Sequence, residues 1–288
     1  MKVLILGSRG NLGSQLMISG EQSGHSLLGW DREDIDLTDW PTVEAKLANL
    51  EIEVIINTVA YNAVDAAETE PGQSLAYALN RDLVDRLAAY CQAHSITLVQ
   101  YSTDYVFSGD QIQGYSENDQ PAPLSHYGLS KAAGEQALVL RQNSLNYYII
   151  RTSKLFGPQG SSPSAKASFF DIMLKLAQSG NELQGVAAEE SCFTYTPDLA
   201  RVTWQILEQK LASGIYHIVN SEAATWFEAL VELKTITGFT NQIKPIDSLL
   251  MPRPAKRPEH SVLLMTKLPA LRSYSEALKE YWQKIKGN

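Results

Sequence analysis

The chain has 288 residues, 44% of them hydrophobic and 19% charged, and its formal net charge is −8. A chain of this length and composition can bury a sizeable core, as one large domain or as two unequal ones. The acidic balance and the scattered lysines and arginines argue against nucleic-acid binding, and no apolar run approaches the length of a membrane span. The two cysteines, Cys91 and Cys192, lie far apart without metal-type spacing, so we expect a cytoplasmic protein with reduced thiols.

The first half of the chain alternates short apolar segments with helical patterns. Strands are expected at residues 3–6, 25–30, 53–56, 97–101 and 147–151, and helices between them at 11–20, 41–50, 72–94 and 125–141. Short buried strands that alternate with helices predict an α/β fold with a doubly wound parallel sheet, the Rossmann architecture.

The pattern changes after residue 151. Residues 159–165 are rich in Ser, Pro and Gly and are expected to form a loop. Beyond them the sequence predicts helices at 169–179, 197–211 and 225–237, and an isolated strand at 215–219. We therefore expect a dinucleotide-binding Rossmann domain at 1–151 and a smaller, mainly substrate-binding region at 152–288, with some of its segments returning to the first sheet.

A glycine-rich loop, G-S-R-G-N-L-G at 7–13, joins the first strand to the first helix. Glycine permits a tight turn, the close approach of a phosphate and the close packing of helix on strand. The helix N-terminus offers free N–H groups and partial positive charge to a pyrophosphate. The alternative is a glycine-rich turn without a ligand, but the position after a strand favours dinucleotide binding. The residues expected to contact the cofactor here are Gly7, Arg9, Gly10, Asn11, Leu12 and Gly13.

The second strand ends at Asp31 and Arg32. An acid at this place bonds the ribose hydroxyls and favours NADH, whereas an arginine meets a 2′-phosphate and favours NADPH. Both cofactors therefore remain open. Asp36 and Leu37 follow, and they either border the adenine or form a helix-capping turn.

Tyr127 and Lys131 form a Tyr-x-x-x-Lys pattern on the helix expected at 125–141. Residues four apart share one helix face, so we expect the ammonium to lie near the phenol and to lower its pKa. The tyrosine can then act as general acid toward a carbonyl that receives a hydride, while the lysine also bonds the nicotinamide ribose. The alternative is a tyrosine and a lysine that merely share an exposed helix face.

The fourth strand favours the catalytic interpretation, because it ends in the hydroxyls of Ser102 and Thr103. In an open α/β sheet, ligands bind beyond the carboxyl ends of the strands. These hydroxyls therefore face the crevice that holds the cofactor. A hydroxyl there can hydrogen-bond the substrate carbonyl beside Tyr127.

These features together resemble the extended short-chain dehydrogenase/reductase superfamily, and further motifs narrow the resemblance to the dTDP-4-dehydrorhamnose reductase family. The resemblance runs from residue 1 to about residue 270. Its motifs are Asn57-x-x-Ala60-Tyr61-x-Ala63-Val64-Asp65-x-Ala67-Glu68, Ser102-Thr103-Asp104-Tyr105-Val106-Phe107-Ser108-Gly109, Tyr115-x-Glu117, Pro123-Leu124, Tyr127-Gly128-x-Ser130-Lys131, Arg151-Thr152-Ser153 and Arg257-Pro258-x-x-Ser261-x-Leu263.

The resemblance implies an NAD(P)H-dependent enzyme that reduces the 4-keto group of a nucleotide-diphospho-sugar. Thr103, Tyr127 and Lys131 would form its catalytic triad. Ala60 and Tyr61 would lie against the cofactor.

The same resemblance suggests residues for the substrate. Asp104 and Tyr105 would line its pocket, with a buried turn as the alternative. Arg257 would hold the diphosphate, because a guanidinium fork suits phosphate oxygens, with a salt bridge as the alternative.

Three features depart from the family's usual pattern. Lys154 replaces an aromatic residue, Leu264 replaces an aspartate, and the stretch 189–196 differs from the usual Gly-x-Pro-Thr. All three lie in or beside the substrate half. We therefore expect intact hydride chemistry and an altered sugar pocket.

Some members of the family bind Mg²⁺ through glutamates, which makes Glu189 and Glu190 candidates. Without further ligands nearby, we expect two solvated surface acids and no metal site. His126 points away from its neighbour Tyr127 on the helix, and His217 is expected to be a strand residue.

Two other functions fit the sequence. One is a reductase for a different nucleotide sugar. The other is a non-catalytic regulatory subunit, because the regulatory β subunit of methionine adenosyltransferase resembles the same family and binds the cofactor. For the enzyme, the expected partner is a small nucleotide-sugar substrate, with no nucleic acid or membrane, and a homodimer remains an option.

Overall fold

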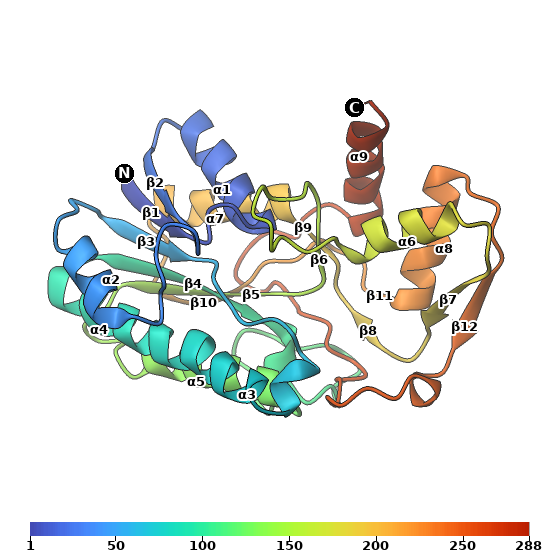
Figure 1. Ribbon diagram of the computed structural model, residues 1–288, viewed down its shortest axis with the longest axis horizontal. Coiled ribbons are helices and arrows are strands. Elements are labelled where there is room, and N and C mark those ends of the chain that lie inside the picture. The colour runs from blue at the N-terminus through green and yellow to red at the C-terminus, as the bar shows by residue number, and fades with distance from the viewer. Residues whose placement is uncertain (288) are drawn as a thin grey trace.

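A parallel sheet of six strands forms the centre of the computed structural model, which describes residues 1–287 (Figure 1). Every neighbouring pair of strands in this sheet is parallel, which confirms the predicted doubly wound α/β fold. Within residues 1–287, no helix combines the length and the apolar character needed to cross a membrane. The strands, in order across the sheet, are β10 (Gly214–His217), β5 (Tyr147–Thr152), β4 (Thr97–Thr103), β3 (Val54–Asn57), β1 (Lys2–Leu6) and β2 (Ser26–Trp30).

Alternate side chains of the strands enter two separate hydrophobic cores, because successive residues of a strand point to opposite faces. In β1, Leu4 and Leu6 belong to one core, and Val3 and Ile5 belong to the other. Helices therefore cover both faces, as a parallel sheet requires. The first core includes α4 (Leu83–His94) and α5 (His126–Val139), and the second includes α1 (Asn11–Gln22) and α7 (Thr196–Glu208), as Figure 1 shows.

The strand order reverses between β1 and β3. From β1 the chain crosses to β2 on one side, and β3 then adds on the other side and begins the run toward β10. At such a point the loops from neighbouring strands diverge and open a crevice beyond the carboxyl ends of the strands. The glycine loop follows β1, and the segment from Thr58 onward follows β3, so both border this crevice.

Residues beyond 151 contribute to the same sheet. The strand expected at 215–219 is not isolated, because β10 pairs in parallel with β5 and forms the outermost strand. α7 packs against α1 in the second core. A boundary at residue 151, with a mainly substrate-binding region after it, stays a prediction.

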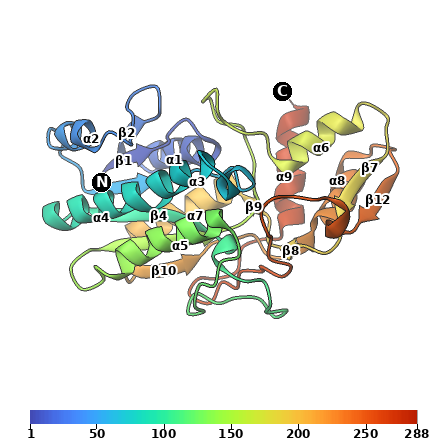
Figure 2. The ribbon, with the colours of Figure 1, turned by 60° about the horizontal axis from the view of Figure 1, so that its bottom comes forward.

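A third hydrophobic core lies in the second half of the chain, at the right of Figure 1. Phe156, Phe170, Phe193 and Tyr195 are buried in it. The turned view of Figure 2 shows this part of the chain at the right, beside the six-stranded sheet and its helices. Its elements are β6 (Leu155–Phe156), α6 (Phe169–Ala177), β7 (Leu183–Val186), β8 (Glu190–Ser191), β9 (Thr194–Tyr195), β11 (Ala224–Thr225), α8 (Trp226–Thr237), β12 (Ile243–Ile246) and α9 (Tyr274–Lys286).

Four helices differ from the predicted pattern by more than two residues, and one of them, α7, ends three residues before residue 211. The helix expected at 72–94 consists of α3 (Gly72–Tyr77), a π-helical turn at Ala78–Asp82, and α4. α2 (Trp40–Leu47) ends three residues before residue 50. No helix is predicted at α9, although Ser273 and Glu276 form a capping box at its start and Tyr274, Ala277, Leu278 and Tyr281 are buried at helical spacing. Short 3₁₀ helices complete the fold at Ala66–Glu68, Asp104–Val106 and Ser248–Leu250.

A buried ion pair joins α5 to β5. Glu135 and Arg151 are 3% and 1% exposed, and the carboxylate accepts hydrogen bonds of 2.9 and 2.7 Å from the guanidinium. The same guanidinium lies 5.0 Å from the centre of the Phe107 ring. Because α5 carries Tyr127 and Lys131, this pair helps to set their position against the strand ends.

We expect Glu135→Ala to lower the free energy of unfolding by about 3–5 kcal/mol, since it leaves the Arg151 charge buried without its partner. Urea unfolding followed by circular dichroism measures the change. Replacement of both partners by apolar residues, E135L with R151M, is expected to recover most of the loss.

The surface pair of Lys2 and Glu51, 2.7 Å apart and largely exposed, provides the matched control. Glu51→Ala is expected to leave the unfolding midpoint unchanged, because water already solvates both charges. Equal losses for Glu135→Ala and Glu51→Ala would contradict the argument from burial.

Candidate active site

The glycine loop after β1, named here the cradle, packs so closely on neighbouring protein atoms that side chains at two of its glycines would not fit. Gly7 has a φ of +78°, a left-handed conformation that favours glycine. A Cβ atom on Gly7 would collide with the Thr58 hydroxyl, and one on Gly13 would collide with the Gly7 carbonyl. Gly10 is the N-cap of α1 and no side chain caps this helix, so its first N–H groups are open to a ligand. This arrangement fits the pyrophosphate of a dinucleotide.

Asp31 is buried at the end of β2 and supports the glycine loop. Its carboxylate accepts a 2.9 Å hydrogen bond from the Arg9 backbone nitrogen and one of 2.8 Å from the Arg32 nitrogen. The Arg9 guanidinium pairs with Glu33 and Asp34, at 3.2 and 3.0 Å. The acid that the sequence suggests for the ribose therefore already holds backbone amides, and its contact with a ribose stays a prediction.

Arg32 is exposed beside this carboxylate. Within residues 1–287 its guanidinium makes no hydrogen bond or ion pair. Asp36 accepts hydrogen bonds of 2.9 and 2.7 Å from the Thr38 nitrogen and hydroxyl, which hold the pKa of Asp36 below its usual value. Leu37 is buried in the first core. The structure thus contains the turn at Asp36, while contact of these two residues with adenine stays a prediction.

Ala60 and Tyr61 follow β3 on the opposite side of the crevice. The Tyr61 nitrogen donates a 2.9 Å hydrogen bond to Asn80 Oδ1, and Asn80 Nδ2 donates to the Tyr61 carbonyl and the Ser130 hydroxyl, both at 3.0 Å. Asn80 therefore ties the segment after β3 to α5. Sequence reasoning missed this residue. The feature of the sequence that could have revealed Asn80 is a polar side chain on the buried face of a helical pattern. Asn80 lies in the π-helical turn, and such turns are common at functional sites.

Thr103, Tyr127 and Lys131 come together at the carboxyl end of β4. Thr103 is the last residue of β4, and Tyr127 lies in the first turn of α5, which the Ser125 hydroxyl caps. The Tyr105 ring stands edge-on to the Tyr127 ring, with 5.9 Å between their centres. The predicted triad is thus one spatial cluster.

The pKa of the Tyr127 phenol is raised to about 12, chiefly by burial, while the Thr103 hydroxyl lowers it and the Asp104 carboxylate raises it. The expectation that Lys131 lowers this pKa is wrong for this structure. Its ammonium instead donates a 2.6 Å hydrogen bond to the Tyr101 carbonyl on β4. The phenol is therefore protonated at neutral pH and can donate a proton.

Lys131 is buried between α5 and β4. Burial lowers the pKa of Lys131 to about 8, and the Glu135 carboxylate one helical turn further on opposes this shift. The ammonium therefore titrates close to neutral pH. The Glu135 carboxylate, which also pairs with Arg151, favours the charged form of this lysine.

Asp104 is buried directly after Thr103. Its carboxylate accepts hydrogen bonds from the Thr103 hydroxyl at 3.0 Å and the Ser261 hydroxyl at 2.7 Å. Burial raises the pKa of Asp104, and the Ser261 hydrogen bond opposes the rise. The motif around Ser261 thus reaches the triad. Asp104 and Tyr105 form a 3₁₀ turn, and their contact with substrate stays a prediction.

Arg257 makes a bidentate ion pair with Asp65, with distances of 3.0 and 2.7 Å. Hydrogen bonding from Arg257 lowers the pKa of the Asp65 carboxyl. Two motifs that lie far apart in the sequence therefore meet. The salt bridge is present, and a role for Arg257 at the substrate diphosphate stays a prediction.

Lys154 follows β5, and its ammonium lies within an aromatic cluster. Nζ is 4.1 Å from the centre of the Trp226 ring and 4.7 Å from that of the Phe193 ring. Burial lowers the pKa of Lys154 to about 8, against the opposing charges of Asp104 and Glu189. The departure from the family pattern at this position thus places a cation near the triad.

Glu189 is not the solvated surface acid that the sequence predicts. It is 5% exposed, accepts a 3.2 Å hydrogen bond from the Trp226 indole and pairs with Arg253. Glu190 lies 3.4 Å from His260. In the described part of the chain, residues 1–287, no group of three or more His, Cys, Asp or Glu is arranged to hold a metal.

Two remaining candidates from the sequence, both histidines, lie outside the triad. His126 Nδ1 is 3.0 Å from Gln73 Nε2 at the start of α5. His217 is a buried residue of β10, as predicted, and its Nδ1 is 3.0 Å from the Leu264 carbonyl. Burial lowers the pKa of His217 to about 4.

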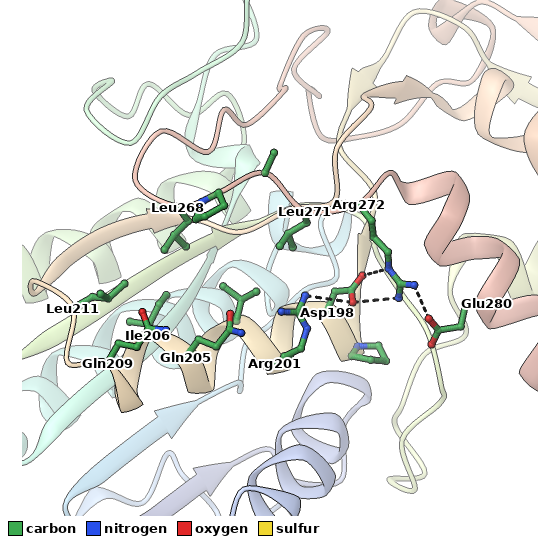
Figure 3. A pocket seen from close by; sticks show the side chains of 14 residues that line it. Asp198, Arg201, Gln205, Ile206, Gln209, Leu211, Leu268, Leu271, Arg272 and Glu280 are labelled. Carbon is green, nitrogen blue, oxygen red and sulfur yellow. Dashed lines mark hydrogen bonds and ion pairs between the residues drawn. The ribbon is translucent and has the colours of Figure 1, made fainter.

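A hollow of about 710 Å³ lies between α7 and the segment at 268–272 (Figure 3). Its polar wall is an ion-pair chain in which Arg272 bonds Asp198 at 2.7 Å and Glu280 at 2.6 Å. None of the residues predicted for cofactor, substrate or catalysis lines it. These charges already satisfy one another, and they link α7 to α9.

The cradle after β1, the triad after β4 and the parallel sheet that joins them define a dinucleotide-dependent oxidoreductase of the short-chain dehydrogenase/reductase superfamily. Comparison with known proteins narrows this class. The family described as RmlD substrate binding domain matches residues 1–286. A dTDP-4-dehydrorhamnose reductase of Streptomyces griseus is 33% identical, over 99% of this chain and 94% of that protein.

Solved structures agree with this assignment. A dTDP-4-dehydrorhamnose reductase from Clostridium acetobutylicum is 32% identical and covers 99% of this chain and 100% of its own, with a TM-score of 0.91. The Bacillus anthracis enzyme of the same name, in complex with NADP, is 30% identical over 98% of this chain and 99% of its own, with a TM-score of 0.90. The chain belongs to the RmlD family, that of the dTDP-4-dehydrorhamnose reductases.

The lowered pKa of Lys154 gives folding stability a defined pH dependence. Below pH 8 the folded protein bears the cost of a buried ammonium, and this cost disappears as the pH rises from about 8 to the ordinary lysine value of 10.5. Lys154→Met removes the titrating group. We compare the free energy of unfolding of this variant with that of wild type. The difference, variant minus wild type, is expected to be about 2–3 kcal/mol larger at pH 7 than at pH 10.

Urea unfolding of both proteins at the two pH values measures this difference. Lys175→Met, on the exposed side of α6, is the matched control and is expected to change stability equally at both pH values. A pH-independent effect of Lys154→Met would show that the ammonium is well solvated.

Proposed function

We propose that this protein reduces the 4-keto group of a nucleotide-diphospho-sugar with NADPH. The observation that carries the proposal is the cluster of Thr103, Tyr127 and Lys131 at the end of β4, beside a cradle shaped for a pyrophosphate. Family membership supports the same reaction. Relatives named for 4-keto reduction of dTDP-sugars come from Streptomyces griseus and, as a probable assignment at 32% identity, Streptomyces antibioticus.

Each residue of the triad has a separate role in the reduction. A bound nicotinamide dinucleotide supplies the hydride that adds to the ketone carbon. The protonated Tyr127 phenol donates its proton to the carbonyl oxygen as negative charge develops there. The Thr103 hydroxyl, whose single proton bonds Asp104 in this structure, would turn that proton to the substrate oxygen and hold it beside the phenol. The Lys131 ammonium, anchored at the Tyr101 carbonyl, would bond the cofactor ribose.

The residues proposed to bind the substrate are chosen by their positions in the fold. Lys154, Asp104 and Tyr105 lie beyond the ends of β4 and β5, where a sugar ring would meet the triad. Arg257 would hold the diphosphate by sharing its guanidinium with Asp65. Both cysteines are unpaired and buried, which agrees with a proposed cytoplasmic location. A monomer and a homodimer are both compatible with this function.

We expect Tyr127→Phe to lower kcat by about 10²–10⁴-fold, because it removes the proton donor and keeps the ring. The dissociation constant for NADPH is expected to stay unchanged. Steady-state oxidation of NADPH with dTDP-, GDP- and UDP-4-keto sugars measures turnover, and quenching of protein fluorescence measures binding.

Tyr90→Phe, in α4 away from the triad, is the matched control and is expected to retain full activity. A wild-type protein that binds NADPH but reduces none of these sugars would contradict the enzyme and support a regulatory subunit. Reduction of a GDP- or UDP-sugar alone would keep the reaction and change the substrate.

The preference for NADPH follows from Arg32. Its exposed guanidinium makes no internal contact within residues 1–287 and lies at the end of β2, where a 2′-phosphate is recognised. We expect Arg32→Met to weaken NADPH binding by about tenfold and to leave NADH binding unchanged. Titration of both dinucleotides against the variant measures the effect, and equal losses for both would contradict this role.

A further inference from the structure

The loop before α6 lies against the dinucleotide cradle. This loop, residues 158–166, is named here the strap. The Gly160 nitrogen donates a 2.9 Å hydrogen bond to Asn11 Oδ1, and the Ser162 nitrogen donates one of 2.9 Å to the Arg9 carbonyl. A Cβ atom on Gly160 would collide with that carbonyl, so the two backbones are in close contact. In Figure 1 the strap is the yellow-green loop that approaches α1.

The last residue of the strap spans the crevice. The Lys166 carbonyl accepts a 2.8 Å hydrogen bond from Asn11 Nδ2 at the start of α1. Its ammonium donates a 2.8 Å hydrogen bond to Asn62 Oδ1, which lies after β3. α1 and the segment after β3 are the two sides of the crevice at the reversal of strand order. Lys166 therefore connects both sides across the place where the cradle receives a pyrophosphate.

The charge balance of the crevice favours a ligand for this ammonium. A dinucleotide pyrophosphate carries two negative charges, and a helix N-terminus offers only a partial positive charge. The Arg9 guanidinium is already paired with Glu33 and Asp34. Within residues 1–287, Lys166 pairs with no carboxylate, and its partner Asn62 is a neutral amide. A hydrogen bond between two ions is stronger than one to an amide, so an arriving pyrophosphate can displace Asn62.

We propose that Lys166 is a pyrophosphate-binding residue and that the strap covers the bound dinucleotide. Its ammonium exchanges Asn62 Oδ1 for a pyrophosphate oxygen, while its carbonyl stays bonded to Asn11. The proposal rests on the proposed function, because it requires a dinucleotide in the cradle. Since the pyrophosphate is common to NADH and NADPH, Lys166 contributes equally to the binding of both.

The test is the affinity of the full-length protein for NADPH and NADH, measured by fluorescence quenching and by calorimetry. Lys166→Met keeps an unbranched side chain that lacks only the terminal ammonium, and we expect about a tenfold weaker affinity for both dinucleotides. Lys166→Arg keeps the charge and is expected to bind both as wild type does. Lys175→Met, on α6, is the matched control and is expected to bind both normally. Thermal unfolding without ligand is expected to be the same for all four proteins.

Three results would overturn the proposal. Unchanged affinities for Lys166→Met would show that the lysine only anchors the loop, and the reductase function would stand if wild type still turns over. A loss confined to NADPH would place the ammonium at the 2′-phosphate. A wild-type protein that binds neither dinucleotide would overturn both this inference and the proposed function.

Discussion

The buried ion pair between Glu135 and Arg151 determines how α5, the helix that carries Tyr127 and Lys131, lies on the sheet. Two charges inside a protein are tolerated only in good mutual geometry, so α5 has one position against β5. One turn earlier, Lys131 bonds the Tyr101 carbonyl of the adjacent strand. Tyr127 lies one turn before that. Because two buried polar contacts hold α5 along its length, the phenol is fixed at the end of β4, where the strand-end hydroxyl also lies.

Burial also decides the protonation states of the site. It keeps the Tyr127 phenol protonated and brings the pKa of two lysines, Lys131 and Lys154, down to about 8. A reductase needs a proton donor that stays protonated until negative charge develops on the substrate oxygen. The raised pKa of the Tyr127 phenol provides this. Burial and hydrogen bonds to single polar groups therefore act together with the ion pair of α5 in setting the state of the site.

The parallel sheet and the glycine loop could be predicted because local patterns encode them, namely apolar runs, glycine spacing and strand–helix alternation. The meeting of Thr103 with Tyr127 followed from the rule that strand ends share one edge of a sheet. Other features depend on partners far away in the sequence. Helical spacing places Lys131 near the phenol, but a carbonyl on β4 binds its ammonium. No local pattern reveals that Asp31 holds the backbone amide of Arg9.

β10 lies more than 60 residues after β5 in the sequence, and this has a consequence for synthesis of the chain. Residues 1–151 contain the cradle, the triad and five of the six strands, yet β5 would then be an open edge. Tyr148 and Ile150 on that strand lie in the core that α7 and Tyr216 of β10 help to build. An unpaired strand with apolar side chains is a template for aggregation. During synthesis this edge therefore stays uncovered until the chain has been made as far as residue 217, the last residue of β10.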